Sequence, residues 1–263
     1  MNWEKETQRI EEFIKLYITI SGTKGIILGL SGGIDSAVVA VLAKRAIKKE
    51  NIHCYYLPML NTNDDIDKKH IKKLCERFDL TYKIREIGLD TEGIIDDSFT
   101  EGISKLNYGN IKARIRMTIL YHYANRLNCL VVGTTNKSEY KIGYFTKYGD
   151  GAVDFEPIQH LYKTEIFELA KYLNIPEEII NKHPTAGLWK DQTDEKEIGM
   201  SYEQLDKILK FIKRNMIVKK QKSYLTSWEN IQTCDINKVL DMMNSAKHKQ
   251  KQPPSLESMF VYD

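Results

Sequence analysis

Cysteine is scarce in this sequence, and its four cysteines do not form metal-binding or redox pairs. Cys54, Cys75, Cys129 and Cys234 are far apart, and no histidine clusters with any of them. Zinc sites and dithiol active sites need closely spaced thiols. We therefore expect reduced, buried thiols, and neither a zinc centre nor a dithiol centre.

Long apolar runs and a large excess of one charge are also lacking. No apolar run approaches the roughly 18 residues of a membrane span, and the first residues, Met-Asn-Trp-Glu-Lys-Glu, are charged. A formal net charge of +3 is too small to indicate nucleic acid or an anionic membrane as a partner. We expect a cytoplasmic protein whose 263 residues, 42% of them hydrophobic, form one domain over 1–263 with a basic tail from about residue 247.

The most informative stretch is residues 25–36, Gly-Ile-Ile-Leu-Gly-Leu-Ser-Gly-Gly-Ile-Asp-Ser. Its apolar run predicts a buried strand, and the apolar spacing that follows predicts a helix. Between them, Gly32 and Gly33 allow backbone angles that expose peptide N–H groups at a helix N-terminus, where anions bind. The run is neither a Walker A motif nor Gly-x-Gly-x-x-Gly. Taken alone, it fits a phosphate loop and an ordinary turn capped by Asp35 or Ser36 equally well.

Strand and helix patterns alternate along the chain. This alternation predicts an α/β fold with a doubly wound, mainly parallel sheet and helices on both faces. The predicted strands are 26–30, 52–59, 80–87 and 129–134, and the predicted helices are 3–20, a helix from 37, 64–78 with Ile66 inward, 110–127, 161–172, 201–214 and 236–246. Segment 90–107 has no clear period and is predicted to be irregular. Ligands of such sheets bind beyond the carboxyl ends of the strands, where residues 31–36 would lie.

Two arginines of the predicted helix 110–127, Arg114 and Arg116, lie differently with respect to its apolar face. That face consists of Ile111, Ile115, Thr118 and Ile119, with His122 at its margin. In a helical projection Arg114 lies on the flank of the face, whereas Arg116 points away. Arg114 is therefore the better candidate to reach a partly buried anion. An arginine that only packs its stem against apolar neighbours explains the pattern equally well.

Two acidic side chains follow the ends of predicted strands. Asp35 comes after the first strand, and Glu139 comes after the strand 129–134. Carboxylates on the same side of a sheet could bridge Mg²⁺ to phosphate oxygens. The sequence therefore predicts a magnesium site at this edge.

Two later segments indicate further contacts. Residues 143–154 combine glycine, aromatic rings and charge without a period, which is typical of an ordered binding loop. Lys163 begins a predicted helix with Thr164 or a neighbour as its cap, and the helix dipole disfavours a cation there unless an anion is also present. We interpret Lys163 as a phosphate contact. The alternative is an exposed lysine, penalised by roughly a few tenths of a kcal/mol.

In this order, the motifs resemble those of the ammonia-dependent NAD⁺ synthetases, a family of N-type ATP pyrophosphatases that amidate nicotinic acid adenine dinucleotide. The resemblance covers nearly the whole chain. It rests on Ser-Gly-Gly-Ile-Asp-Ser36, on residues 110–117, 133–139 and 144–151, on Pro184-Thr185 and on His248-Lys249. The run Phe-Thr-Lys-Tyr-Gly-Asp at 145–150 is much more specific to this family than the first motif. The resemblance also implies an adenine nucleotide alpha hydrolase-like fold.

The resemblance implies a role for each matched position. ATP would contact Gly29, Leu30, Ser31, Gly32, Gly33, Ile34, Asp35, Ser36, Thr134, Lys163 and Thr185. The dinucleotide would contact Arg114, Lys147, Asp154, His248 and Lys249, and Mg²⁺ would be held by Asp35 and Glu139. Asp35 and Lys163 would be the catalytic residues. Gly187 stands where the family usually has aspartate, so the local substrate contact there departs from the pattern.

The implied reaction needs alignment and charge neutralisation more than a nucleophilic side chain. The nicotinate carboxylate would attack the α-phosphorus of ATP to give an adenylate and pyrophosphate, and ammonia would then displace AMP. The amides of Gly32 and Gly33, Mg²⁺ and Lys163 would stabilise the phosphate charge. No glutaminase-like segment is seen, so free ammonia is the expected donor. The family is homodimeric, and the first helix is a candidate interface.

Two other function classes fit part of the pattern. A tRNA-thiolating enzyme shares the loop, but it would be expected to have catalytic or cluster-binding cysteines and a more basic surface. A nucleotide sensor without catalysis would be favoured by loss of Asp35 or Glu139, and both are present.

Overall fold

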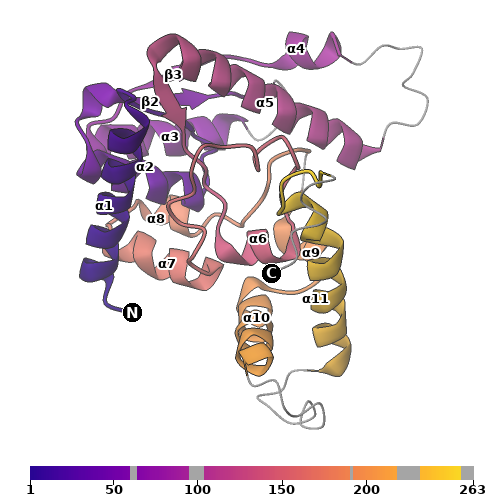
Figure 1. The fold of residues 1–263 in the computed structure, drawn as a ribbon. Helices are drawn as coiled ribbons and strands as arrows, with labels where there is room; N and C mark the ends of the chain where they lie inside the picture. Colours follow the sequence, from indigo (N-terminus) through magenta and orange to yellow (C-terminus); the bar gives the residue numbers. More distant parts are fainter. Residues whose placement is uncertain (60–63, 95–103, 190–191, 218–231, 256–263) are drawn as a thin grey trace.

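A parallel sheet forms the centre of the molecule. The computed structural model describes residues 1–59, 64–94, 104–189, 192–217 and 232–255. Within these ranges the strands pair in the order β3-β2-β1-β4. Their bounds are β1 Gly25–Gly29, β2 Ile52–Tyr56, β3 Tyr82–Ile84 and β4 Cys129–Val131. Figure 1 shows the sheet in the upper part of the molecule and the helices α10 and α11 below it.

Helices account for most of the remaining described chain. They are α1 Trp3–Ser21, α2 Ile34–Ala46, α3 Asp64–Phe78, α4 Gly88–Glu92, α5 Lys105–Leu127, α6 Lys137–Ile142, α7 Lys163–Tyr172, α8 Glu177–Ile180, α9 Asp194–Ile198, α10 Tyr202–Ile217 and α11 Thr233–Ala246. Short 3₁₀ helices span Lys49–Asn51 and Lys247–Lys249. Across the described ranges, none of these helices combines the length and apolar character of a membrane span.

The two faces of β1 pack against different helices. Ile26 and Leu28 belong to an apolar cluster that also contains residues of α1, α2, α3 and α7. Ile27 points to the opposite face, where it shares a cluster with Ile115 and Ile119 of α5. Alternate residues of a strand point to opposite faces, so β1 is buried on both sides. The prediction of a doubly wound parallel sheet with helices on both faces is confirmed.

The strand order reverses beside β1. From β1 the chain continues to β2 and β3 on one side, and it then crosses to β4 on the other side of β1. Loops that leave the carboxyl ends of strands at such a reversal diverge and open a crevice for a ligand. The segments after β1 and β4 carry Asp35 and Glu139, so the topology brings these distant parts of the chain to one place.

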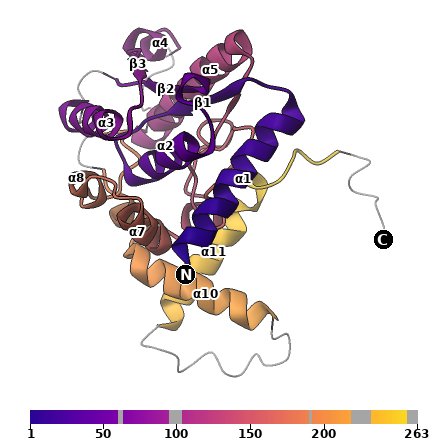
Figure 2. The ribbon, with the colours of Figure 1, turned by 90° about the vertical axis from the view of Figure 1, so that its left-hand side faces the viewer.

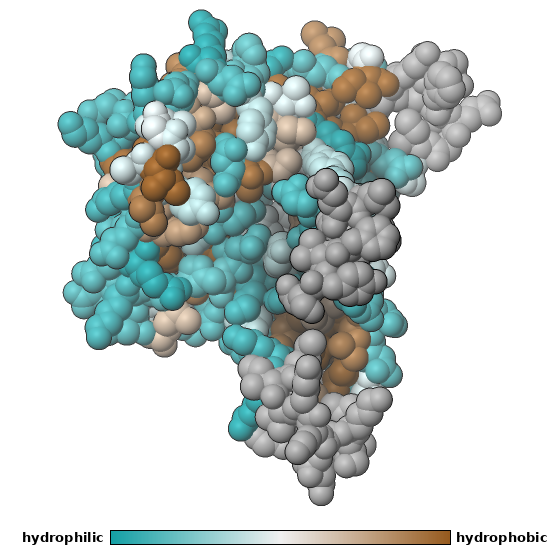
Figure 3. Space-filling model, in the orientation of Figure 1, coloured by the Kyte–Doolittle hydropathy of each residue, from teal (hydrophilic) through white to brown (hydrophobic). Residues whose placement is uncertain are grey.

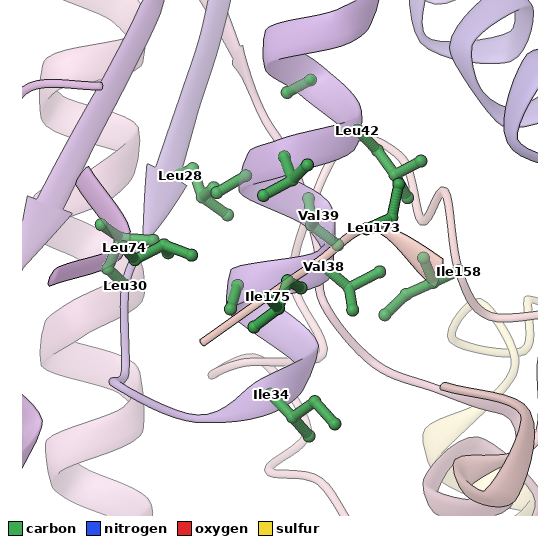
Figure 4. Close-up of a cluster of buried hydrophobic side chains, with 14 of the residues drawn as sticks. Leu28, Leu30, Ile34, Val38, Val39, Leu42, Leu74, Ile158, Leu173 and Ile175 are labelled. Carbon is green, nitrogen blue, oxygen red and sulfur yellow. The ribbon is translucent and has the colours of Figure 1, made fainter. Parts of the chain in front are cut away.

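Helix α2 is buried around nearly its whole circumference. Figure 4 shows Val38, Val39 and Leu42 of this helix among side chains of β1, α3 and the region after α7. A helix that is apolar all round belongs to a protein interior rather than to its surface. The loop before α2 is therefore attached at both ends to the core, because β1 is buried as well.

A second group of helices packs below the sheet. Residues of α6, α9, α10 and α11 form their own apolar cluster, to which Tyr162 beside α7 contributes. Figure 2 shows α10 and α11 together at the lower end of the molecule. The basic segment after α11 packs back on this group, since Lys249 Nζ donates to the carbonyl oxygens of Gly143 at 2.8 Å and Phe145 at 2.9 Å.

Several predicted positions differ from the observed ones. Ile66 is 53% exposed rather than buried, and Thr118 and His122 are also exposed. Of the four thiols expected to be buried, Cys234 is exposed. Helix α5 begins at Lys105, five residues earlier than predicted, because Ser104 caps it by accepting the Asn107 N–H. The predicted strand 80–87 is reduced to β3. The segment 90–107 was predicted to be irregular, but 90–92 belong to α4 and 105–107 to α5, and the part 95–103 lies outside the described residues.

Shortening a buried side chain of α2 should destabilise the fold far more than shortening an exposed apolar side chain. Leu42 is fully buried, and Leu42→Ala should lower the free energy of unfolding by about 2–5 kcal/mol because it leaves a cavity. The matched control Ile66→Ala on the exposed face of α3 should change it by no more than about 0.5 kcal/mol. Urea unfolding monitored by circular dichroism measures both. An equal decrease in the free energy of unfolding for Leu42→Ala and Ile66→Ala would contradict the burial of α2 in the core.

Candidate active site

The turn between β1 and α2 is held by its own serines. Ser36 Oγ accepts the Ser31 N–H at 3.2 Å and donates to the Gly33 carbonyl oxygen at 3.1 Å. The Gly33 N–H donates to Ser31 Oγ at 3.2 Å. Gly32 has a φ of +73°, in the left-handed region where a side chain is strained. The amide of Gly33, which we expected to face a phosphate, therefore already has an acceptor within the turn.

The next three amides remain for an anion. The first backbone bond of α2 runs from the Ala37 N–H to the Gly33 carbonyl oxygen at 3.2 Å. The N–H groups of Ile34, Asp35 and Ser36 come before this bond, so helix geometry provides them with no acceptor inside the helix. An anion at this N-terminus would also interact with the helix dipole. The amides available to an anion after Gly33 are thus those at the start of α2.

Lys163 lies between the two predicted metal ligands. Its side chain is only 2% exposed, and its Nζ is 2.5 Å from Asp35 Oδ2 and 3.3 Å from Glu139 Oε1. The alternative of an exposed lysine is therefore wrong. The expected proximity of Asp35 and Glu139 is also observed, since both contact the same ammonium.

The backbone around Lys163 explains how a cation is tolerated at a helix start. Helix α7 begins at Lys163, with Tyr162 rather than Thr164 as the N-cap. The Lys163 N–H donates to Ser138 Oγ at 2.9 Å, and the Thr164 N–H donates to Asp206 Oδ2 at 2.9 Å. Asp206 thus supplies a negative charge at the positive end of the α7 dipole.

Glu139 has a structural partner for each of its oxygens. It is the acidic residue of a capping box at the start of α6, where Glu139 Oε2 accepts the Asn136 N–H at 3.3 Å. Its other oxygen, Oε1, faces Lys163 and lies 3.4 Å from the Tyr202 hydroxyl oxygen. The Asn136 side chain donates in turn to Asp35 Oδ1 at 3.0 Å. Helix capping therefore sets the position of this carboxylate.

A second group of side chains, which no sequence pattern indicated, surrounds the lysine. Tyr202 donates to Asp194 Oδ2 at 3.0 Å, and Tyr144 donates to Asp194 Oδ1 at 3.1 Å. The Asp194 N–H donates to the Pro184 carbonyl oxygen at 3.0 Å. Asp194 thus connects the segment before Thr185 with the loop 143–154. The capping pattern of Asn136 could have been recognised from sequence, whereas nothing local distinguishes Tyr202 or Asp194.

The charges around Lys163 do not balance. Burial lowers the pKa of the Lys163 ammonium, but Asp35, Glu139 and Asp194 outweigh this effect and the net shift is upward. Burial raises the pKa of Glu139, and Lys163 opposes that shift only in part. One ammonium faces three carboxyl groups, so the site favours an additional proton or cation.

The carboxylates of Asp35 and Glu139 are few but chemically suited to Mg²⁺. Within the described ranges, no three side chains of His, Cys, Asp or Glu converge as a metal site. Asp35 and Glu139 nevertheless present hard carboxylate oxygens side by side. Protein-bound Mg²⁺ commonly takes one or two carboxylates and completes its shell with substrate phosphates and water. The donor set is therefore compatible with Mg²⁺ bound alongside a phosphate.

Glu156 is a further acid that sequence analysis did not select. It follows Phe155, which bridges to Val132 beyond the end of β4. Glu156 Oε2 accepts the Thr135 N–H at 3.1 Å, and a Cβ on Gly133 would come within 2.4 Å of its carboxyl group. Burial raises the pKa of Glu156 from 4.5 to about 8. No spacing rule links this residue to Glu139, because the tertiary fold brings them together.

The predicted dinucleotide contacts lie along the loop 143–154 and the segment after α11. Arg114 is exposed and its Nη2 donates to the Lys147 carbonyl oxygen at 3.3 Å. Asp154 Oδ2 accepts the Val131 N–H at 2.7 Å, so this carboxylate also has a structural partner. Burial lowers the pKa of Lys249, with Asp150 opposing, and His248 is exposed.

Arg116 of α5 does not lie as the helical projection predicted. Arg116 is half-buried, and its Nε donates to the Leu57 carbonyl oxygen at 3.0 Å. The prediction that it points away from the core was wrong. The sheet edge beyond β2 reaches this side of α5, which a single-helix projection cannot show.

The two predicted threonines lie on separate segments. Thr134 is half-buried just after β4. Thr185 Oγ accepts the Gly187 N–H at 3.1 Å. Gly187 has a φ of +62° with open space where a Cβ would stand, so this turn suits glycine.

Comparison with known proteins identifies close relatives over nearly the full length. A family model described as NAD synthase matches residues 6–253. The chain is 43% identical over 254 residues to the NH(3)-dependent NAD(+) synthetase of Archaeoglobus fulgidus, covering 97% of each chain.

Solved structures show the same similarity. The NH3-dependent NAD synthetase of Campylobacter jejuni, solved with nitrate, has a TM-score of 0.80 at 37% identity, covering 97% of this chain and all of that one. The NMN synthetase of Francisella tularensis has a TM-score of 0.82 at 31% identity, covering 97% of this chain and 98% of that one.

Protonation of Glu156 should make stability depend on pH in a defined direction. Because its pKa is raised in the fold to about 8, the folded state keeps a proton that the unfolded chain loses above about pH 4.5. Relative to that of Glu156→Gln, the free energy of unfolding of the wild type should therefore decrease by up to about 1.4 kcal/mol per pH unit as pH rises, until about pH 8. Urea unfolding from pH 5 to 9 measures the difference.

A control for this prediction is Glu178→Gln. The pKa of exposed Glu178 is lowered by a hydrogen bond from Lys73. Its carboxylate therefore stabilises the fold above its unfolded pKa, and this contribution is lost as the pH falls into the acid range. A constant difference between wild type and Glu156→Gln across pH 5–9 would show that Glu156 is ionised throughout.

Proposed function

The chain belongs to the NAD synthase family, and we propose that it makes NAD⁺ by amidating nicotinic acid adenine dinucleotide with ammonia and ATP. Relatives named for ammonia dependence cover nearly its whole length at about the same size. The observation that carries the proposal is the position of Asp35, Glu139 and Lys163 beside the unpaired amides of α2.

The reaction has two displacements. An oxygen of the nicotinate carboxylate attacks the α-phosphorus of ATP, the bond from that phosphorus to the bridging oxygen breaks, and pyrophosphate leaves. Ammonia then attacks the carboxyl carbon of the adenylate, the bond to the AMP oxygen breaks, and a proton is released. Neither step needs a protein nucleophile, so the protein contributes orientation and charge stabilisation.

The residues of the site divide this work. The amides of Ile34, Asp35 and Ser36 and the ammonium of Lys163 stabilise negative charge on the phosphate oxygens. Asp35 and Glu139 keep Lys163 charged and in place, and the same two carboxylates would hold Mg²⁺. When bound, Mg²⁺ neutralises charge on the phosphates. ATP would contact residues 29–36, Thr134, Lys163 and Thr185.

The dinucleotide would lie along the loop 143–154. Its contacts would be Arg114, Lys147, Asp154, His248 and Lys249. Support comes from the packing of the segment after α11 onto this loop through Lys249, and from the approach of Arg114 to the Lys147 backbone. In this proposal the segment from 247 would form an edge of the dinucleotide site, with Lys249 packed on the loop and His248 exposed.

We extend the proposal to assembly. The family resemblance implies a homodimeric, cytoplasmic enzyme with one domain over 1–263. Exposed apolar side chains support an interface: Leu16 and Ile20 are 54% and 67% exposed on α1, and Leu89 is 82% exposed on α4. Figure 3 shows apolar surface near α4 on an otherwise mostly hydrophilic face.

The direct test is to mix the purified protein with ATP, Mg²⁺, ammonium and nicotinic acid adenine dinucleotide. Equal amounts of AMP, pyrophosphate and NAD⁺ are expected, and glutamine in place of ammonium should give little product. Nicotinic acid mononucleotide is the comparison substrate, because one structural relative is named for NMN. Faster conversion of the mononucleotide would overturn the dinucleotide assignment.

Removal of the Asp35 charge should abolish turnover. Asp35→Asn should slow pyrophosphate release by about 100-fold or more, because it removes a partner of Lys163 and a proposed Mg²⁺ ligand. The control is Asp79→Asn, whose carboxylate is 70% exposed and pairs with Lys49 at the surface. Full activity of Asp35→Asn, measured by pyrophosphate release, would locate the metal site elsewhere.

Lys147 should serve the dinucleotide more than ATP. Lys147→Ala should raise KM for the dinucleotide about tenfold by removing a charge-assisted contact, with a much smaller change for ATP. Exposed Lys141 on α6 provides the control variant Lys141→Ala. Steady-state kinetics with each substrate varied in turn measures both constants. Equal effects on the two substrates would exclude a specific role in dinucleotide binding.

A further inference from the structure

A second lysine lies beside the phosphate loop, on the side of helix α3. Lys182 follows α8 and precedes Thr185, and its Nζ forms an ion pair with Asp67 Oδ1 in the first part of α3. Both side chains are largely buried, with exposed fractions of 15% and 16%. The functions assigned above use neither residue.

The geometry places this ion pair against Gly32. A Cβ on Gly32 would stand 2.8 Å from Asp67 Cα and 2.9 Å from Asp67 Oδ1. That oxygen is the one bonded to Lys182. His70 Nδ1 also lies 3.3 Å from the Gly32 carbonyl oxygen. The first turns of α3 therefore rest directly on the phosphate loop and bring the Lys182 ammonium to its edge.

The position of Asp67 needs a reason. A carboxylate next to a loop that binds triphosphate repels the ligand, and burial strengthens that repulsion. This repulsion is removed if the carboxylate holds a cation that can move to the phosphates when the nucleotide binds. A lysine suits this exchange, because its ammonium is a compact charge on a flexible stem and can change partners by rotating its side chain.

A purely structural role, in which the Lys182–Asp67 ion pair attaches α3 to the region of α8, does not explain why this pair is buried. Lys73 and Glu178 form another ion pair between α3 and α8, and each of these side chains is 53% exposed. The two elements thus already have a surface link of the kind that contributes about 0–1 kcal/mol. Of these two ion pairs, the Lys182–Asp67 pair is the one that contacts the phosphate loop and is largely shielded from solvent.

We propose that Lys182 is a phosphate-binding residue for the two ATP phosphates that leave as pyrophosphate. In the absence of nucleotide, Asp67 holds the ammonium at the edge of the loop. When ATP binds, Lys182 Nζ moves from Asp67 to the β- and γ-phosphate oxygens and neutralises charge on the leaving group. The inference rests on the proposed function, since it assumes that the loop binds ATP.

The exchange predicts opposite effects for the two partners. Lys182→Ala removes a phosphate contact, so it should weaken pyrophosphate binding. Asp67→Asn removes the competing acceptor, so it should strengthen pyrophosphate binding, and this gain should require Lys182. If the pair were purely structural, both substitutions would weaken pyrophosphate binding to a similar extent. The double variant would then bind pyrophosphate no more weakly than either single variant.

The experiment is calorimetric titration of pyrophosphate, and separately of AMP, in the presence of Mg²⁺. Lys182→Ala should raise Kd for pyrophosphate about tenfold and leave Kd for AMP unchanged, because AMP lacks the outer phosphates. Asp67→Asn should lower Kd for pyrophosphate several-fold, and in the double variant this gain should disappear. Lys182→Arg should retain most of the affinity. Lys73→Ala is the matched control and should bind as the wild type does.

Two results would overturn the inference. Unchanged pyrophosphate affinity in Lys182→Ala, or equal weakening by Lys182→Ala and Asp67→Asn, would reduce the pair to a structural link while the proposed function stands. Failure of the wild type to bind pyrophosphate or to form NAD⁺ would overturn both the proposed function and this inference. Urea midpoints of all variants establish that each is folded.

Discussion

One buried ammonium joins three parts of the chain that are distant in sequence. Lys163 begins α7, Asp35 lies in the first turn of α2, and Glu139 lies in the first turn of α6. A charge removed from water is costly unless it is paired and hydrogen-bonded. Loss of either acid would leave the lysine with an incomplete set of partners in a poorly solvated position. The mutual dependence of these three charges fixes how the ends of the three helices meet.

The core of the molecule gives this arrangement its rigidity. The loop before α2 leaves a strand buried on both faces and enters a helix buried nearly all round. Its amides therefore point in a direction set by packing, before any ligand is bound. Such preorganised dipoles stabilise charge in a transition state without reorganising during the reaction. The reversal of strand order beside β1 then places the segment after β4 next to them.

The site holds its cations with acids in two different ways. Lys163 has several carboxyl neighbours, and their combined effect keeps it protonated and in place. Among the residues that the structure describes, Lys182 has one acidic partner at the edge of the loop. A phosphate can compete with a single partner more easily than with several. In the proposed enzyme, the first lysine is thus a fixed element of the charge distribution and the second is a mobile one.

Local patterns in the sequence predicted the strands, most helices and the loop, because glycine conformation and apolar spacing act over a few neighbouring residues. They also selected Asp35, Glu139 and Lys163, which the fold brings together. The same patterns misjudged Ile66 and Arg116, and they gave no signal for Glu156, Asp194 or Lys182. The exposure of a helical residue and the partner of a charged side chain depend on which elements pack against it. The sequence alone therefore determined the elements and the chemistry available, whereas only the tertiary structure decided which charges meet, because those contacts join segments far apart in the chain.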